Sequence, residues 1–190
     1  MANSKVKIFR YADTQYPKMW EKEAQIIEDI RASHLDQALQ IYRCSENTLV
    51  LPSGRKWQAT QDVVKALSDD GWSVLSRRSG GAPVPQTAGM LNVSHFYLWP
   101  EYSAYSVKQA YECLCHALTL FFESLGINVQ PHATAHSFCD GDYNLNVDGQ
   151  KIVGTAQRVL TVRKNRRLVL AQACILMSGD MQNVVRLRSI

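Results

Sequence analysis

An α+β fold is predicted by three features of this 190-residue chain. Segments with the two-residue alternation of strands come in runs, and longer segments with helical periodicity are inserted between the runs. The regular strand and helix alternation of a βαβ array is not apparent in the sequence. Hydrophobic residues make up 46% and charged residues 20% of the chain, as in ordinary globular proteins, so the simplest interpretation is one domain over residues 1–190.

The expected helices begin and end at residues typical of helix termini. Pro17 favours the first turn of one helix, and Gly71 and Gly126 follow two others in the usual stop position. The expected helices are residues 17–30, 60–69 and 106–125, with a further helix starting near Asp180. The side chains expected to face the core are Trp20, Ala24, Ile27 and Ile30 in the first helix, and Ala110, Leu114, Ala117, Leu118, Phe121 and Phe122 in the third.

The expected strands are short runs rich in β-branched and aromatic residues, bounded by polar turn residues. They are residues 6–10, 39–43, 48–51, 72–75, 90–99, 143–147 and 168–177, together with a short strand ending at Val129 and one that begins at Ile152. The segment 76–89, rich in glycine and proline, is expected to be a loop.

The hairpin around Lys151 is the first candidate site. Asp148 and Gly149 are the pair that a type I′ turn requires, so Lys151 is expected at or next to the turn. Gly154, Thr155 and Ala156 then place little bulk on the returning strand, which weakens a strand unless a ligand or another backbone comes close. A lysine beside such a slot could hold a carboxylate or phosphate while an apolar group lies along the strand. The alternative is a solvated turn lysine followed by a packing glycine.

The middle loop is the second candidate site. Arg77 and Arg78 stand at a strand end, and Ser79, Gly80 and Gly81 follow them. The planar guanidinium group matches carboxylate and phosphate, and residues with little side chain let backbone N–H groups close around an anion. The alternative is an ordinary connector with exposed arginines. The loop is not a P-loop, because no Gly-Lys-Ser/Thr follows and no helix is expected after it.

The cysteine pattern suggests neither a disulfide framework nor a structural zinc site, and no metal site is expected. The five cysteines, at positions 44, 113, 115, 139 and 174, are odd in number and show no repeated Cys-x-x-Cys spacing. Cys113, Cys115 and His116 fall on the third expected helix, where we interpret the thiols as small core groups.

Charge and hydrophobicity indicate neither a membrane nor a nucleic-acid partner. The net charge of +4 is mild, and the densest basic run, residues 163–167, is interpreted as a solvated turn in preference to a dock for an acidic partner or phosphate. No stretch approaches the roughly 20 apolar residues of a spanning helix, and residues 1–7 lack the apolar core of a signal peptide. The expected location is the cytoplasm.

Two motifs in order make the chain resemble the lipoate-protein ligase and octanoyltransferase family, to which biotin protein ligases are related. The first motif is Arg-Arg-Ser-Gly-Gly-Ala from Arg77, followed by Gly-Met-Leu-Asn ending at Asn92. The second is Asp-Gly-Gln-Lys-Ile-Val-Gly-Thr-Ala-Gln, which begins at Asp148. The resemblance spans roughly residues 39–177. It implies a mixed, largely antiparallel sheet flanked by helices, and a slot for an acyl chain.

The implied activity is attachment of lipoate or octanoate to a lysine of a lipoyl carrier domain. In the leading hypothesis a ligase uses ATP and Mg²⁺ to form an acyl-adenylate, and the carrier lysine then displaces AMP. The implied carriers are the lipoyl domains of 2-oxoacid dehydrogenases and the H protein of glycine cleavage, with acyl carrier protein as a further candidate. The family resemblance implies these roles: Arg77 and the backbone of Ser79, Gly80 and Gly81 hold the acyl carboxyl or phosphate, Lys151 neutralises it, Asn92 supports the loop, and Gly154, Thr155 and Ala156 floor the slot.

Departures from the family pattern keep two alternatives open. Ala82 replaces a loop glycine, and Gln86 stands where many members have histidine, which bears on nucleotide binding. One alternative is an ATP-independent octanoyl or lipoyl transferase with Cys139 as nucleophile. It would need a cation such as Lys151 beside the thiol and His136 as a possible base.

The second alternative is a non-catalytic paralogue that binds ligand or carrier. The sequence shows no accessory C-terminal domain, so the expectation is either a catalytic domain that works alone or a chain shortened at its C-terminus.

Overall fold

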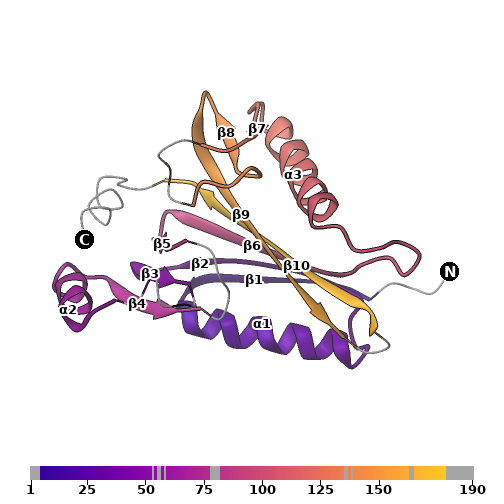
Figure 1. Ribbon diagram of the computed structural model, residues 1–190, viewed down its shortest axis with the longest axis horizontal. Helices are drawn as coiled ribbons and strands as arrows, with labels where there is room; N and C mark the ends of the chain where they lie inside the picture. The colour runs from indigo at the N-terminus through magenta and orange to yellow at the C-terminus, as the bar shows by residue number, and fades with distance from the viewer. Residues whose placement is uncertain are drawn as a thin grey trace.

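The computed structural model describes residues 5–52, 54, 57, 59–77, 82–134, 137, 139–162 and 165–178 (Figure 1). Ser79, Gly80 and Gly81 of the predicted anion loop lie outside these residues, as do Arg78, His136 and the helix expected near Asp180. The elements, in order, are β1 (Val6–Thr14), α1 (Tyr16–Arg31), β2 (Gln37–Cys44), β3 (Thr48–Leu51), α2 (Gln61–Asp69), β4 (Ser73–Ser76), β5 (Val84–Gln86), β6 (Met90–Leu98), α3 (Val107–Ser124), β7 (Gln130–Pro131), β8 (Leu145–Val147), β9 (Gln150–Thr161) and β10 (Arg167–Leu176).

The strands form one large and one small sheet. The large sheet has the order β1-β2-β6-β10-β9-β8-β7, and the small sheet has the order β4-β3-β5. β1 is parallel to β2, whereas the pairs β2–β6, β6–β10, β10–β9, β9–β8 and β8–β7 are antiparallel. The predicted α+β fold with a mixed, largely antiparallel sheet is therefore confirmed. Parallel pairing occurs where a helix connects the strands, as α1 connects β1 to β2 and α2 connects β3 to β4.

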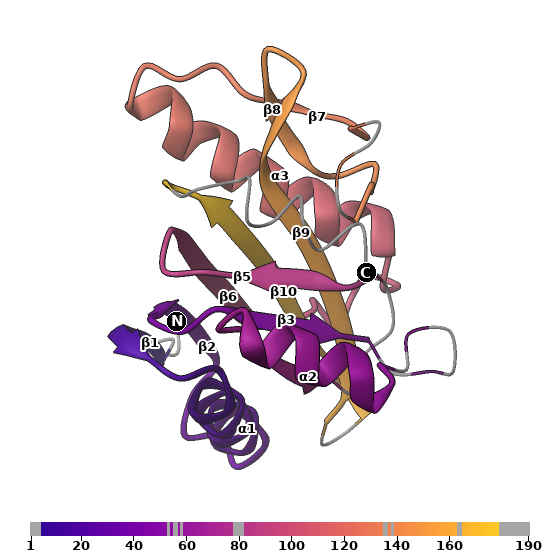
Figure 2. The same ribbon diagram turned by 90° about the vertical axis from the view of Figure 1, so that its left-hand side faces the viewer.

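Two expectations for short strands needed correction. The strand expected to end at Val129 lies just after it, as β7, because Gln130 and Pro131 are the residues that pair with β8. β5 lies inside the segment predicted to be a loop, and it contains Pro85. Proline cannot donate a hydrogen bond to a sheet and is therefore confined to edge strands and bulges. β5 is such an edge strand, since it pairs only with β3. The small sheet and α2 face the viewer in Figure 2, below α3 and the β8–β9 hairpin.

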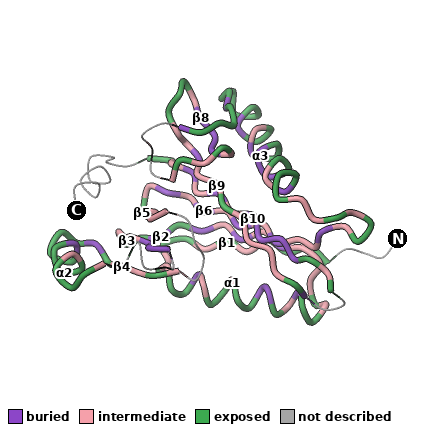
Figure 3. The backbone as a smooth tube through the Cα atoms, in the orientation of Figure 1, coloured by how far each residue is buried: buried purple, intermediate pink, exposed green. Residues whose placement is uncertain are grey.

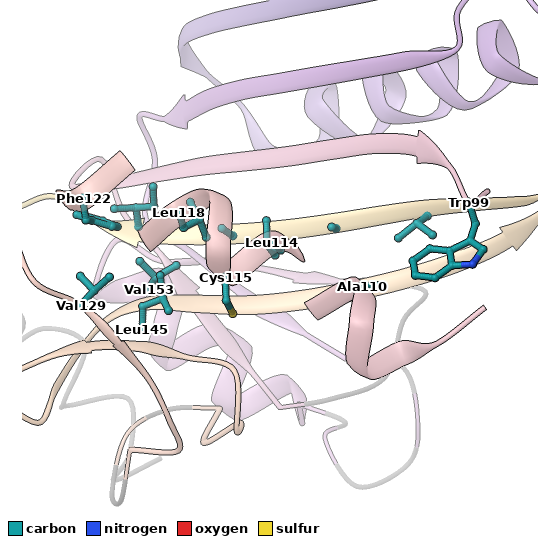
Figure 4. Close-up of a cluster of buried hydrophobic side chains, with 13 residues drawn as sticks. Trp99, Ala110, Leu114, Cys115, Leu118, Phe122, Val129, Leu145 and Val153 are labelled. Atoms are coloured by element: carbon teal, nitrogen blue, oxygen red, sulfur yellow. The ribbon is translucent and has the colours of Figure 1, made fainter. Parts of the chain in front are cut away.

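Helices α1 and α3 lie on opposite sides of the large sheet (Figure 1). On the α3 side, Leu114, Cys115, Leu118 and Phe122 pack against Val153 and other apolar residues of β9 and β10 (Figure 4). We call this side the α3 face and the other the α1 face. Burial is greatest where these layers meet, while α2 and the tip of the β8–β9 hairpin are largely exposed (Figure 3).

The predicted core faces of the helices needed partial correction. In α1 the buried residues are Met19, Ile26, Ile27 and Ile30, and Ala24 is exposed, because the helix turns a different stripe toward the sheet. In α3, Ala117, Phe121, Cys113 and His116 are exposed on its outer side, whereas Cys115 is buried as predicted.

Candidate active site

The β8–β9 hairpin has the predicted turn. Asp148 and Gly149 have φ values of 49° and 74°, and the strands pair as Val147 with Gln150 and Asn146 with Lys151. Positive φ at both central residues is the signature of a type I′ turn, which Asp-Gly favours. The turn therefore places Lys151 one residue into the returning strand.

A β-bulge turns Lys151 onto the α1 face. Leu145 pairs with Val153, but the next residue of β8 pairs with Lys151, so Ile152 is an extra residue in β9. Gly154 pairs with Cys174, whose neighbours on β10 alternate between the two faces. Strict alternation from Gly154 would put Lys151 on the α3 face. Instead, its Cε and Nζ lie 3.2 and 3.3 Å from the position that a Cβ at residue 154 would occupy.

Lys151 is partly buried and contacts the segment that carries Cys139. Its Nζ donates a hydrogen bond to the backbone oxygen of Cys139 at 3.0 Å. Burial lowers the pKa of Lys151, and the thiols of Cys139 and Cys174 and the carboxylate of Asp140 oppose that shift. The interpretation of Lys151 as a solvated turn residue is therefore wrong, and its position suits a group that holds an anion or transfers a proton.

Cys139 is held in a backbone conformation that few residues with a side chain adopt. Its φ is +51°, and its carbonyl oxygen accepts a second hydrogen bond, from Asn144 Nδ2 at 2.9 Å. The Cys139 thiol is close enough to Lys151 and Arg77 to raise the pKa of both. The partly exposed thiol therefore lies within electrostatic range of two cationic side chains.

Arg77 leaves the end of β4 and reaches back into the structure. Its guanidinium donates to the backbone oxygens of Val50 at 3.2 Å and Ala82 at 2.7 Å. Burial lowers the pKa of Arg77, while Tyr16 and Cys139 oppose this effect. Arg77 therefore ties together the two ends of the loop that was predicted to bind an anion, and it also lies near the thiol.

Asn92 anchors the strand that follows this loop. Its Nδ2 donates to Gln86 Oε1 at 2.9 Å, and Gln86 Nε2 contacts Cys174 Sγ at 3.6 Å. Burial raises the pKa of Cys174 to about 11, and the contact with Gln86 and the charge of Lys151 lower it. Gln86 is thus buried between β5 and the large sheet, where its amide is used within the protein.

The three small residues of β9 divide between the two faces. Gly154 lies on the α1 face below Lys151, and Ala156, two residues on, is exposed on the same side. Thr155 points to the α3 face, where its hydroxyl donates to Tyr143 O at 2.8 Å. Of the three, Gly154 and Ala156 can therefore floor a slot beside Lys151.

A buried polar network continues from this floor. Glu23 on α1 pairs with Arg158 at 3.2 Å and accepts a hydrogen bond from Gln172, which also donates to Ser94. Burial raises the pKa of Glu23, and Arg158 and Gln172 oppose the shift. Sequence analysis missed this network, although Glu23 interrupts the apolar spacing between Met19 and Ile27.

No group of three or more His, Cys, Asp or Glu side chains in the described ranges could hold a metal ion. The carboxylate nearest in sequence to Cys139, that of Asp140, accepts a hydrogen bond from the Thr134 amide at 2.6 Å. The described side chains therefore supply no metal cage of their own.

A shallow depression beside α2, lined by Ala59, Gln61, Val64, Lys65, Ser68 and Asp69, contains none of the site residues. Within the part of the chain that the structure covers, no helix is long and apolar enough to cross a membrane.

The fold is shared with solved lipoate-protein ligase structures. The Ta0514 protein of Thermoplasma acidophilum with bound lipoic acid superposes with a TM-score of 0.70 and 17% identity, over 94% of this chain and 70% of that one. Lipoate-protein ligase A bound with ATP superposes with a TM-score of 0.67 and 16% identity, over 95% of this chain and 69% of that one. At these identities the likeness concerns the fold.

The chain belongs to the lipoyl protein ligase A/B catalytic domain family, whose model matches residues 15–189. It is 35% identical over 144 residues to the uncharacterized protein H16_B0148 of Cupriavidus necator, covering 70% of this chain and 57% of that protein. It is 31% identical over 115 residues to an octanoyl-[GcvH]:protein N-octanoyltransferase of Geobacillus kaustophilus, covering 60% of this chain and 40% of that enzyme. The chain thus spans about half the length of these relatives. The family resemblance stated from the two motifs is confirmed.

Proposed function

We propose that this protein transfers an octanoyl or lipoyl group between lipoyl carrier domains through a thioester on Cys139. The observation that carries the proposal is the contact between Lys151 and Cys139. Lys151 Nζ lies 3.0 Å from the Cys139 backbone oxygen, and the thiol is within electrostatic reach of both Lys151 and Arg77. A nearby cation stabilises the thiolate, which is the reactive form. The octanoyltransferase from Geobacillus kaustophilus supports the choice of reaction.

In the first step the Cys139 thiolate attacks the carbonyl carbon of the acyl-lysine amide on the donor carrier. Negative charge develops on the carbonyl oxygen, where the Lys151 ammonium and Arg77 stabilise it. The C–N bond then breaks, Lys151 gives a proton to the departing lysine nitrogen, and the acyl group remains on Cys139 as a thioester. A lysine whose pKa is lowered by burial is suited to this proton transfer.

In the second step the amine of the acceptor carrier attacks the thioester carbonyl. The C–S bond breaks, the thiolate leaves, and neutral Lys151 takes up the proton of the acceptor amine. The starting pair of ammonium and thiolate is thereby restored. Gly154 and Ala156 are the proposed floor for the acyl chain, since Gly154 leaves room for the Lys151 side chain above it.

The second candidate function is the ATP-dependent ligase. Its support is the shared fold of lipoate-protein ligase A, a structure bound with ATP. In that reaction ATP would activate the acyl carboxyl group, and Lys151 and Arg77 would hold the resulting anion.

The mass of the acceptor lipoyl domain after incubation distinguishes the transferase from the ligase. The protein is incubated with an acceptor lipoyl domain and either octanoylated carrier without nucleotide, or octanoate with Mg-ATP. The transferase predicts acceptor modification in the first mixture, abolished by Cys139→Ser. Modification only in the second mixture, unaffected by Cys139→Ser, would establish the ligase and overturn the proposed transfer. Absence of modification in both would leave the non-catalytic binding paralogue.

A further inference from the structure

Asn144 makes several hydrogen bonds beside residues 139–141, which we call the Cys139 turn. It is 1% exposed and precedes β8. Its backbone N–H donates to Gly141 O at 3.1 Å, and its backbone oxygen accepts from the His132 N–H at 3.0 Å. Its side chain makes two further bonds, to Cys139 and to Thr155. One buried amide thus joins the Cys139 turn to β9.

Strand β9 requires a partner at this point. β8 pairs with β9 only as far as Val153, so none of the described strands pairs with the outer edge of β9 at Thr155. Asn144 Oδ1 accepts a hydrogen bond from the Thr155 N–H at 3.4 Å, and Tyr143 O accepts one from the Thr155 hydroxyl. The Asn144 side chain therefore replaces the missing backbone acceptor, because an unpaired buried N–H is costly.

The two side chains that donate to the Cys139 oxygen differ in what the proposed reaction requires of them. Lys151 Nζ and Asn144 Nδ2 lie 3.0 and 2.9 Å from that oxygen. Cys139 has a φ of +51°, a conformation that is maintained only when the surroundings hold it. In the proposed reaction Lys151 must turn to the substrate oxygen and transfer a proton. Asn144 can hold the turn during that step, since it has no other role in the reaction.

We propose that Asn144 is a positioning residue that locks the Cys139 turn onto β9, and that it must be an amide and not a carboxylate. An aspartate at this position could still accept from the Thr155 N–H. It would lose the donor to the Cys139 oxygen and would place a negative charge beside Lys151 and the thiol. The role in acyl transfer rests on the proposed function, but the effect on the thiol does not.

The test is the rate at which iodoacetamide alkylates Cys139, followed by peptide mass against pH. Exposed Cys113 in the same chain is the internal reference. The ionisable groups that interact electrostatically with this thiol include Lys151, Arg77 and Tyr111, and Asp140, the next residue in the chain, acts on Lys151. We expect Asn144→Asp to slow Cys139 relative to Cys113 about tenfold at neutral pH, and to shift its profile to higher pH.

Asn146 provides the matched control. It is 2% exposed, and its side chain bonds to His132, Thr134 and the Asn144 backbone without touching Cys139. Asn146→Ser, which adds no charge opposite Lys151, should lower the melting temperature and leave the ratio of Cys139 to Cys113 alkylation unchanged. If Asn144→Asp does not fold, Asn144→Ser is measured, with an expected slowing of about threefold. A wild-type ratio and pH profile in the folded Asn144 variant would overturn the inference.

The outcomes separate this inference from the proposed function. If wild-type protein transfers no acyl group while Asn144→Asp slows alkylation, Asn144 positions the thiol and the transferase proposal fails. If acyl transfer proceeds through Cys139 and the Asn144 variants alkylate at the wild-type rate, the positioning inference alone fails.

Discussion

The two faces of the large sheet have different chemistry, although the same strands form both. On the α3 face, Val169, Ala171 and Ile175 of β10 pack against α3 in a continuous apolar layer. On the α1 face, the same strand presents Gln172 and Cys174, which bond to Glu23 and Gln86. The same face is apolar at Leu168 and Leu170, which belong to the cluster packed against α1. We infer that both faces stabilise the fold and that the polar end of the α1 face carries the site.

The largest expected effect that separates the faces is on activity. Lys151→Ala removes the cation beside Cys139 and the proposed proton donor, so acyl transfer should fall by about 10³-fold. Thermal stability should change little, because the partly buried ammonium is itself unfavourable to desolvate. Single-turnover transfer and a melting curve measure the two quantities. A large loss of stability with near-normal transfer would assign Lys151 a structural role.

The opposite pattern is expected on the α3 face. Phe122 is 5% exposed in the apolar cluster, and Phe122→Ala should lower the free energy of unfolding by about 3 kcal/mol. Transfer by the fraction that remains folded should be unchanged, because Phe122 contacts no site residue in the cluster. Denaturant unfolding and transfer at low temperature test this. Loss of transfer in fully folded protein would show that the two faces are coupled.

A smaller effect is expected from Gly154→Ala. The added Cβ would lie 3.2 Å from Lys151 Cε, so the flexible end of the lysine must move. We expect transfer to fall about tenfold, as for loss of one charge-assisted hydrogen bond, with little change in stability. Acyl-transfer rates and melting temperatures of the wild-type protein and Gly154→Ala test this expectation. Wild-type transfer would mean that the contact between Gly154 and Lys151 is not used in the reaction.

The smallest expected effect is a change in the pH dependence of stability. Burial raises the pKa of Glu23, so the folded state binds its proton more tightly than the unfolded state does. Its contribution to the unfolding free energy is therefore greatest at low pH and decreases as pH rises through the ordinary value of 4.5 toward the raised value. Glu23→Gln removes this slope, so unfolding measured from pH 4 to 7 should show the variant gaining relative to wild type as pH rises. Parallel curves would contradict the assignment.

Local chemistry explains how much of the fold and site the sequence could predict. The turn at Asp148 and Gly149 depends on adjacent residues, and it was predicted together with Lys151. The two motifs predicted the family and placed Arg77 and Lys151 in one site. The bulge at Ile152 was not predicted, because it depends on pairing with Leu145 across the hairpin.

The polar network was beyond sequence reasoning for a similar reason. Glu23, Arg158 and Gln172 come from α1, β9 and β10, and only the register of the sheet brings them together. Asn144 gave no signal in the sequence, since its importance depends on the end of β8 and on the Cys139 turn. Strand β5 was hidden by Pro85 because its edge position is a tertiary property, and β7 was expected to end at Val129, just before its actual start.

The most direct test of the central claim is the intact mass of the protein itself after incubation with octanoylated carrier domain in the absence of ATP. The transferase predicts one added octanoyl group on Cys139, removable by hydroxylamine, discharged by unmodified acceptor carrier and missing in Cys139→Ser. If the acceptor becomes modified while no adduct forms on the protein, even with rapid quenching, and Cys139→Ser retains full activity, the thioester mechanism is contradicted.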